Sequence, residues 1–204
     1  MPDSIVQVTS GAGPKLHTWQ STIGANNVED EFVLMGMYPY ATYEVHGAGI
    51  SIATANDHVL CLNSAASIKL RVVRIRVEQQ ANATAAASAQ FRVLRTTTSA
   101  PTGGTAVTAN PFDTADAASS AAGRTLPTAK GTEAAELLAT VLLMRQAILA
   151  TSAQMDDAWE WTALNLQKAI VVPAGTTSGL VIKSLSAIAG ATVNVSMEFV
   201  ETAF

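Results

Sequence analysis

The chain has three histidines and one cysteine, the residue types that most often bind metals or perform covalent chemistry. His17, His46 and His58 are not spaced four residues apart and are not part of a His-Glu-x-x-His arrangement, the spacings that place two imidazoles on one metal ion. Cys61 is single, so it forms neither an internal disulfide nor a thiolate zinc site. We therefore expect no metal site and no cofactor.

A short acidic run, Asp156-Asp157 followed by Glu160, offers the paired carboxylates that a glycosidase uses. Such a pair must stand about 5 to 9 Å apart across a cleft. Neighbouring residues of a strand point to opposite faces, so Asp157 could approach Glu160 only around a turn. A solvated turn before a strand explains the run more simply. The sequence therefore favours a protein that is not an enzyme, with a glycosidase using Asp157 and Glu160 as the weaker alternative.

Trp159 and Trp161 flank Glu160 and would share one face of a strand. Two neighbouring indole rings can form a platform on which a sugar stacks, or they can be large side chains of a core or a subunit contact. We favour the core or the subunit contact, because aromatic residues make up only 5% of the chain. The ligand platform stays open as the alternative.

Tyr38, Tyr40 and Tyr43 surround Pro39, where a segment of irregular composition meets the strand-rich remainder of the chain. Aromatic residues at such a junction can anchor a core or an interface between subunits. We expect an interface, with Trp19 contributing from the preceding segment.

Composition excludes several classes of protein. The 204 residues are 49% hydrophobic, which excludes intrinsic disorder, but no apolar run approaches the roughly 20 residues of a membrane-spanning helix. A net charge of -4 gives no attraction to nucleic acid phosphates. The first residues lack the basic and apolar regions of a signal peptide. We expect no direct contact with nucleic acid or membrane.

Alternation of apolar and polar residues predicts an all-β chain. Val193, Val195, Met197 and Phe199 alternate with polar residues and predict a half-buried strand. In residues 67–78 the apolar phase flips between Val72 and Val73, which predicts a β-bulge or a bend. The same segment and the one at 91–95 together resemble a long hairpin.

The domain organisation follows from the point in the chain at which the alternation of apolar and polar residues begins. Residues 1–40 mix Gly, Pro and Asn without sustained periodicity and predict an extended N-terminal arm with short strands. Residues 41–204 predict one antiparallel β-sandwich, with a long surface loop at 101–130. Residues 133–150 fit both a short amphipathic helix and a strand, and the pattern does not decide between them.

Segments spread over most of the chain carry a family resemblance. They are the Tyr38-Pro39-Tyr40 junction, SIKLRVV at 67–73, GGTAVT at 103–108, DTADAA at 113–118, VPAGTT at 172–177 and the terminal strand at 193–201. In these segments the chain resembles a family of structural proteins predicted from tailed bacteriophage genomes. The resemblance implies a virion component with a jelly-roll-like sandwich and no catalytic residues.

Low charge agrees with a protein built for assembly. Only 14% of the residues are charged, against about 25% in an ordinary soluble domain, which is easier to understand if neighbours cover much of the surface. We therefore expect a virion protein, assembled in the host cytoplasm, that decorates and stabilises the capsid. Its partners would be its own copies, with a trimer preferred, and virion proteins such as the major capsid protein. The alternative is a carbohydrate- or receptor-binding module of a tail or fibre.

Overall fold

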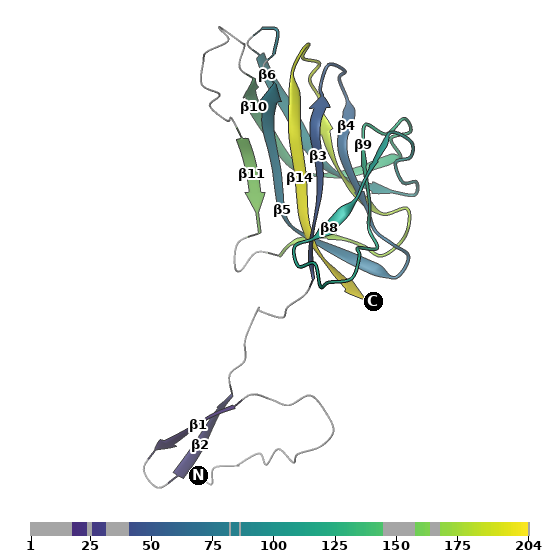
Figure 1. Ribbon diagram of the computed structural model, residues 1–204. Coiled ribbons are helices and arrows are strands. Elements are labelled where there is room, and N and C mark those ends of the chain that lie inside the picture. The colour runs from purple at the N-terminus through teal and green to yellow at the C-terminus, as the bar shows by residue number, and fades with distance from the viewer. Residues whose placement is uncertain are drawn as a thin grey trace. The chain divides into compact units, whose positions relative to one another are not determined.

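The structure is a computed structural model in which the chain divides into two compact units, residues 1–39 and residues 40–204 (Figure 1). It describes residues 18–23, 26–31, 41–81, 83–85, 87–144, 158–163 and 168–203. In the first unit β1 (Thr18–Ile23) and β2 (Asn26–Glu31) form an antiparallel hairpin. The described part of the second unit consists of strands and loops without a helix, so the short helix that the sequence left open is not found there.

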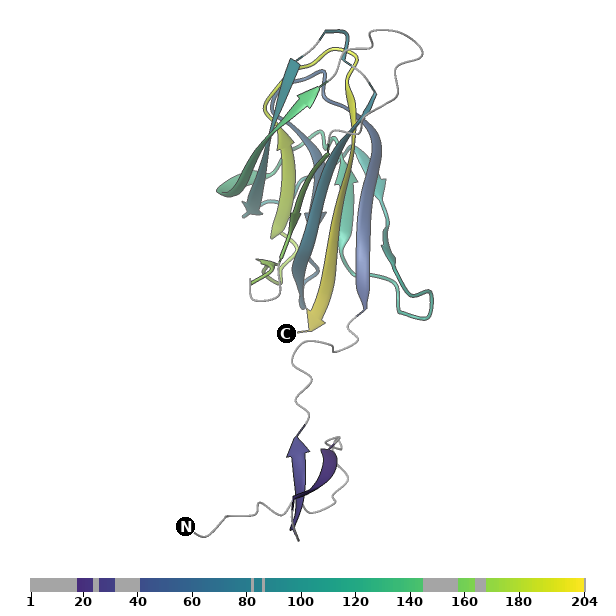
Figure 2. The same cartoon turned by 90° about the vertical axis from the view of Figure 1, so that its left-hand side faces the viewer.

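The second unit contains two antiparallel sheets packed face to face, as the sequence predicts for a β-sandwich (Figures 1 and 2). The first, called the β14 sheet, has the order β11 (Ala158–Thr162), β5 (Ile68–Ala81), β14 (Thr192–Ala203), β3 (Thr42–Ser51) and β8 (Ala109–Pro111), and β12 (Ile170–Val172) also pairs with β5. The second, called the β13 sheet, has the order β10 (Thr132–Met144), β6 (Ala87–Thr97), β13 (Gly179–Ser184), β4 (Asp57–Asn63), β9 (Ala122–Thr125) and β7 (Thr105–Val107).

The strand partners are nested along the chain. β3 pairs with β14, β4 with β13, β5 with both β12 and β11, and β6 with β10. The chain therefore behaves as one long hairpin, with β3 to β6 as one arm and β10 to β14 as the other, rolled up so that it supplies strands to both sheets. This is the topology of a jelly roll, which the sequence resemblance implies.

The core lies between the sheets and is formed by alternating residues of the central strands. Val193, Val195, Met197 and Phe199 of β14 are all buried, which confirms the predicted half-buried strand. Phe199 stacks on Tyr43 of β3 with ring centroids 5.6 Å apart. Aromatic rings at this distance add to the stabilisation that burial of apolar surface provides.

The predicted irregularity at Val72 and Val73 is confirmed as a bulge. β14 pairs Glu198 with Arg74 and the next residue, Phe199, with Val72, so Val73 is an extra residue in β5. This single insertion restores the phase, because Val72 before it and Ile75 after it are both fully buried. The bulge also marks where the other neighbour of β5 changes from β12 to β11.

For residues 133–150 the structure gives a strand as far as Met144, and residues 145–150 lie outside the described part. Leu142 and Met144 are buried, whereas Val141 and Leu143 point outward. A strand prevails over helix propensity here because β6 offers backbone partners from Thr132 to Met144. Tertiary pairing thus decides what the local pattern left open.

Two further expectations differ from the structure. The segments at 67–78 and 91–95 do not form a hairpin, since β5 and β6 belong to different sheets. The 101–130 segment is not only loop: β8 extends the β14 sheet beside β3, and β9 and β7 extend the other sheet beside β4. The first difference arises because β5 pairs with β14 and β6 pairs with β13, which belong to different sheets. The second arises because exposed sheet edges gain hydrogen bonds from strands that reach them.

Candidate functional site

Both tryptophans of the possible sugar platform lie on β11 with their rings half-buried against the core. In register, Trp159 is opposite Val77 and Trp161 is opposite Ile75, two fully buried residues of β5. The indole rings therefore extend the core to the edge of the β14 sheet. This packing use favours the core interpretation of the pair over the platform.

Glu160 lies between the two tryptophans on the opposite, exposed face of β11. Its carboxylate accepts hydrogen bonds from Arg74 at 2.7 Å and from the Thr162 hydroxyl at 3.1 Å. The bond from Arg74 in particular lowers the pKa of Glu160 below 4.5. A carboxyl group that stays ionised is a poor general acid, and its proposed partner Asp157 lies outside the described residues.

Of the four aromatic residues expected in an interface, Tyr43 is the one whose side chain the structure describes. It is only 4% exposed, and its hydroxyl donates a hydrogen bond to the carbonyl of Ala117 at 3.1 Å. Tyr43 thus acts in the core and holds the loop before β9, and it presents little surface to a partner. Trp19 lies on β1 opposite Asp30, and Tyr38 and Tyr40 lie outside the described residues.

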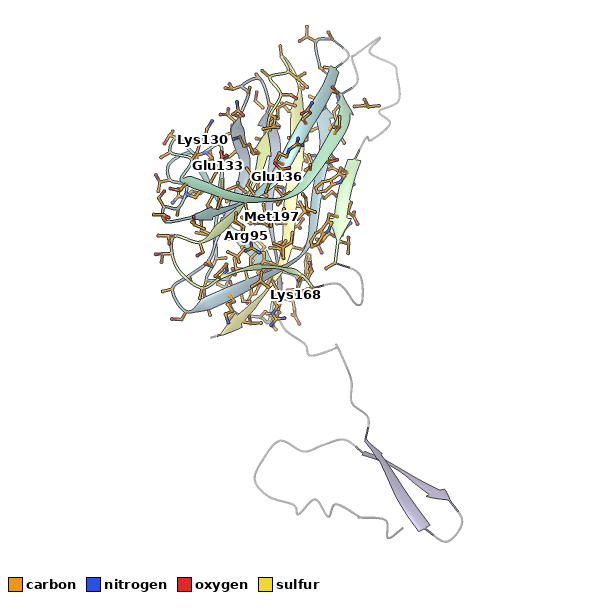
Figure 3. The ribbon with its side chains drawn as sticks, turned by 180° about the vertical axis from the view of Figure 1, so that it is seen from behind. Arg95, Lys130, Glu133, Glu136, Lys168 and Met197 are labelled. Carbon is orange, nitrogen blue, oxygen red and sulfur yellow. The ribbon has the colours of Figure 1, made fainter. Side chains whose placement is uncertain are left out.

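A mixed polar cluster joins three strands of the β13 sheet around His58. Figure 3 shows that sheet from behind, with Glu133 labelled on β10. The fully buried His58 Nε2 lies 2.9 Å from a carboxylate oxygen of Glu133, and Lys183 of β13 donates to both oxygens of that carboxylate at 2.9 Å. The contact therefore joins β4 and β10, two strands that β13 and β6 separate in the order of the sheet.

Burial lowers the pKa of His58 below 6.5, although the Glu133 carboxylate acts in the opposite direction. Burial alone would raise the pKa of Glu133, but hydrogen bonds from Lys183 and His58 outweigh it and lower the pKa below 4.5. The Nδ1 atom of His58 is buried without a hydrogen-bond partner. A proton on Nδ1 would therefore have no acceptor, which fits a neutral imidazole that tethers β10 to the sheet.

A polar hollow of about 330 Å³ lies on the outer face of the β14 sheet, where β5, β14, β3 and β8 run side by side. The polar side chains that line it are Glu44, His46, Arg76, Glu78, Asn110, Asn194 and Ser196. Local sequence patterns do not predict this hollow, because its residues come from four strands that are distant in the chain.

The free edge of β10 is the second surface feature that sequence reasoning missed (Figure 2). In the described part of the chain β10 pairs only with β6, so its other side carries unpaired backbone groups. Residues 137–144 contain no charge, and the outward side chains of Val141 and Leu143 are 57% and 66% exposed. The other edge strands are shorter: β7 and β8 have three residues each and β11 has five.

The described residues hold no cluster of three or more His, Cys, Asp or Glu side chains that could bind a metal ion. They also include no helix that is long and apolar enough to span a membrane. No protein-family model matches the chain, and no curated protein and no solved structure matches it either.

Proposed function

We propose that the chain is a non-enzymatic structural protein that assembles into a virus particle, as a decoration or stabilising protein on a tailed-phage capsid. The free β10 edge carries this proposal, supported by the low charge of the chain and by the sequence resemblance. Jelly rolls occur in viral capsid proteins but also in lectins, so the fold is compatible with the proposal without selecting it.

Soluble proteins protect the edges of their sheets against pairing with other chains. A long edge strand normally carries charges, prolines or bulges in its exposed stretch, since unpaired backbone groups otherwise recruit further strands. β10 has bulges between Glu133 and Leu138, but residues 138–144 pair regularly with β6 and are uncharged. Such an edge suits a strand that is covered in the working assembly.

The exposed apolar side chains give the scale of the stabilisation. Complete burial of a Val or Leu side chain contributes about 1.5 to 3 kcal/mol. Val141 and Leu143 are 57% and 66% exposed, so covering them would contribute roughly 1 to 2 kcal/mol each. A symmetric oligomer, with a trimer preferred, gains this at every contact. Binding the assembled shell but not its dissociated parts then stabilises the shell by mass action.

The oligomeric state tests the proposal. We expect the purified chain to form an oligomer in sedimentation equilibrium, and Leu143→Lys to shift it toward the monomer by placing a charge on the edge. The matched control is Ala118→Lys, which adds the same charge to an exposed loop residue and should leave the oligomer intact. A monomeric wild type, or an oligomer that both variants leave unchanged, would contradict the proposal.

Co-sedimentation with empty capsid shells tests separately whether the chain binds to a capsid. We expect the wild type to pellet with shells and Leu143→Lys to remain in the supernatant. If the chain forms an oligomer that does not bind shells, the proposal of self-assembly stands and the proposal of a place on the capsid is contradicted.

The second candidate function is a carbohydrate- or receptor-binding module. The specific observation that favours it is the polar hollow on the β14 sheet, since the two tryptophans are engaged in packing.

A further inference from the structure

We propose that the outer hollow of the β14 sheet binds one neutral saccharide unit through its hydroxyl groups. The inference deepens the carbohydrate-binding candidate and does not depend on the β10 edge. At about 330 Å³ the hollow lies at the lower end of the range for small-molecule sites, which suits a single sugar ring.

One wall of the hollow is held in place by hydrogen bonds. Asn194 accepts a hydrogen bond from the Gly49 amide at 3.0 Å and donates one to Glu78 at 3.1 Å. The other carboxylate oxygen of Glu78 lies 2.7 Å from the guanidinium of Arg76. These contacts fix the orientation of three polar side chains from β5 and β14 before any ligand arrives, so little entropy would be lost at this wall on binding.

The opposite wall carries side chains that have no partner within the described part of the chain. Glu44, His46 and Asn110 all line the hollow, and no hydrogen bond or ion pair joins their side chains to another described residue. They come from neighbouring strands, since Glu44 stands opposite Asn110 in the pairing of β3 with β8. Their unused acceptors and donors are therefore directed to one shared region of the surface.

Glu44 is also in an unfavourable place for stability alone. Its partner in register on β14 is another carboxylate, Glu198, and like charges directly opposite each other destabilise a sheet. Arg74 neutralises Glu198 at 2.9 Å, whereas Glu44 has no such partner among the described residues. Residues that lower stability without a compensating contact, as Glu44 does opposite Glu198, are expected at functional sites.

The mixture of groups indicates the class of ligand. Glu44 offers acceptors, Arg76 offers donors, and Asn110 offers both. A sugar hydroxyl both donates and accepts, so neighbouring hydroxyls match all three, whereas a cationic ligand would leave the Arg76 donors facing a like charge. No Phe, Tyr or Trp side chain is among the described residues that line the hollow, so recognition would be through the hydroxyl edge of the ring and the dissociation constant would lie in the millimolar range.

The test is a titration of the full-length protein with the methyl glycosides of glucose, galactose, mannose and N-acetylglucosamine, followed by backbone amide chemical shifts. At least one glycoside should shift the amides of Glu44, Asn110 and Ser196. Glu44→Gln should weaken that binding about tenfold or more, the loss expected when a hydrogen bond to a charged group is weakened, and Asn110→Ala should weaken it by about twofold to tenfold, the loss expected for a neutral hydrogen bond. Glu136→Gln, which changes an exposed carboxylate of the other sheet, should bind like the wild type.

Folding and assembly are checked in the same samples. Glu44→Gln removes a like-charge pair, so its melting temperature should equal or exceed that of the wild type, and a loss of binding cannot then be due to unfolding. The proposal is overturned if no glycoside shifts these amides, if the shifts survive both substitutions, or if methylguanidinium binds there in place of sugars. Sedimentation of the same samples tests assembly through the β10 edge independently. Failure of saccharide binding therefore does not decide the assembly proposal, and failure of assembly does not decide saccharide binding.

Discussion

Mild acid should destabilise the sandwich through His58. Burial lowers the pKa of this imidazole, so over a range of pH the unfolded chain binds a proton at His58 that the folded chain does not bind. Stability therefore falls as the pH drops below about 6.5, the ordinary value in an unfolded chain. Glu133, Lys130 and Lys183 are the charged groups that act on the ring, and Glu133, with its own lowered pKa, stays ionised across this range.

The magnitude follows from a single proton. One proton taken up only by the unfolded state costs about 1.4 kcal/mol per pH unit once the pH is below the unfolded pKa. Between about pH 7.5 and about pH 5.5 the accumulated loss is therefore at most about 1.4 kcal/mol, the limit for an imidazole that stays neutral in the folded chain. Below about pH 4.5 the protonation of Glu133 adds a second loss, because its folded pKa is also depressed.

Urea unfolding at the two pH values measures this loss, and two histidine variants assign it. In His58→Gln the amide can still donate to Glu133 but does not titrate, so the variant should lose less stability than the wild type over the same range, by up to about 1.4 kcal/mol. His46→Gln removes an exposed histidine of the other sheet and should behave like the wild type. The imidazole of His58, followed directly by NMR, should titrate below pH 6.5.

Two results would refute this reasoning. One is a His58 imidazole that titrates at or above its ordinary value. The other is an equal loss of stability in the wild type and His58→Gln.

Two further predictions concern packing and a loop. Phe199→Ala removes a fully buried ring stacked on Tyr43 and should cost about 3 to 5 kcal/mol in thermal or urea unfolding, and a cost below about 1 kcal/mol would contradict the packing. Glu201 accepts hydrogen bonds from the Ser119 hydroxyl and from the backbone amides of Ser120 and Ala121, so Glu201→Ala should cost about 1 to 2 kcal/mol and speed hydrogen exchange at those amides. Glu136→Ala, which removes a surface ion pair with Arg92, should cost less than about 1 kcal/mol and leave exchange at those amides unchanged.

The sequence was sufficient for the features that depend on local alternation. The phase flip at Val73 predicted the bulge, because a period-two pattern cannot change face without an extra residue. The strand at the C-terminus followed from the same rule, and the two sheets followed from the many short apolar runs. These features require no knowledge of which strands become neighbours.

Features that depend on the choice of partner were beyond the reach of local patterns. β5 and β6 are adjacent in the chain yet lie in different sheets, since the rolled hairpin pairs each with a strand from the far end of the chain. The hollow arises where Glu44, Arg76 and Asn110 meet across strands, and the tether of His58 to Glu133 spans 75 residues. In the sequence, the segment that forms the free edge of β10 is recognisable only as an uncharged apolar run. That it lies at the edge of a sheet follows from its pairing with β6 alone in the described part of the chain.

Hydrogen exchange along β10 tests the central claim, that this edge is covered in the assembly, most directly. Alternate amides of residues 137–144 point away from β6 and are unpaired within the described part of the chain. Raising the protein concentration, or adding capsid shells, should slow exchange at these amides while those of β8, at the edge of the other sheet, exchange as before. Exchange at β10 that stays fast in the fully assembled protein would contradict the account.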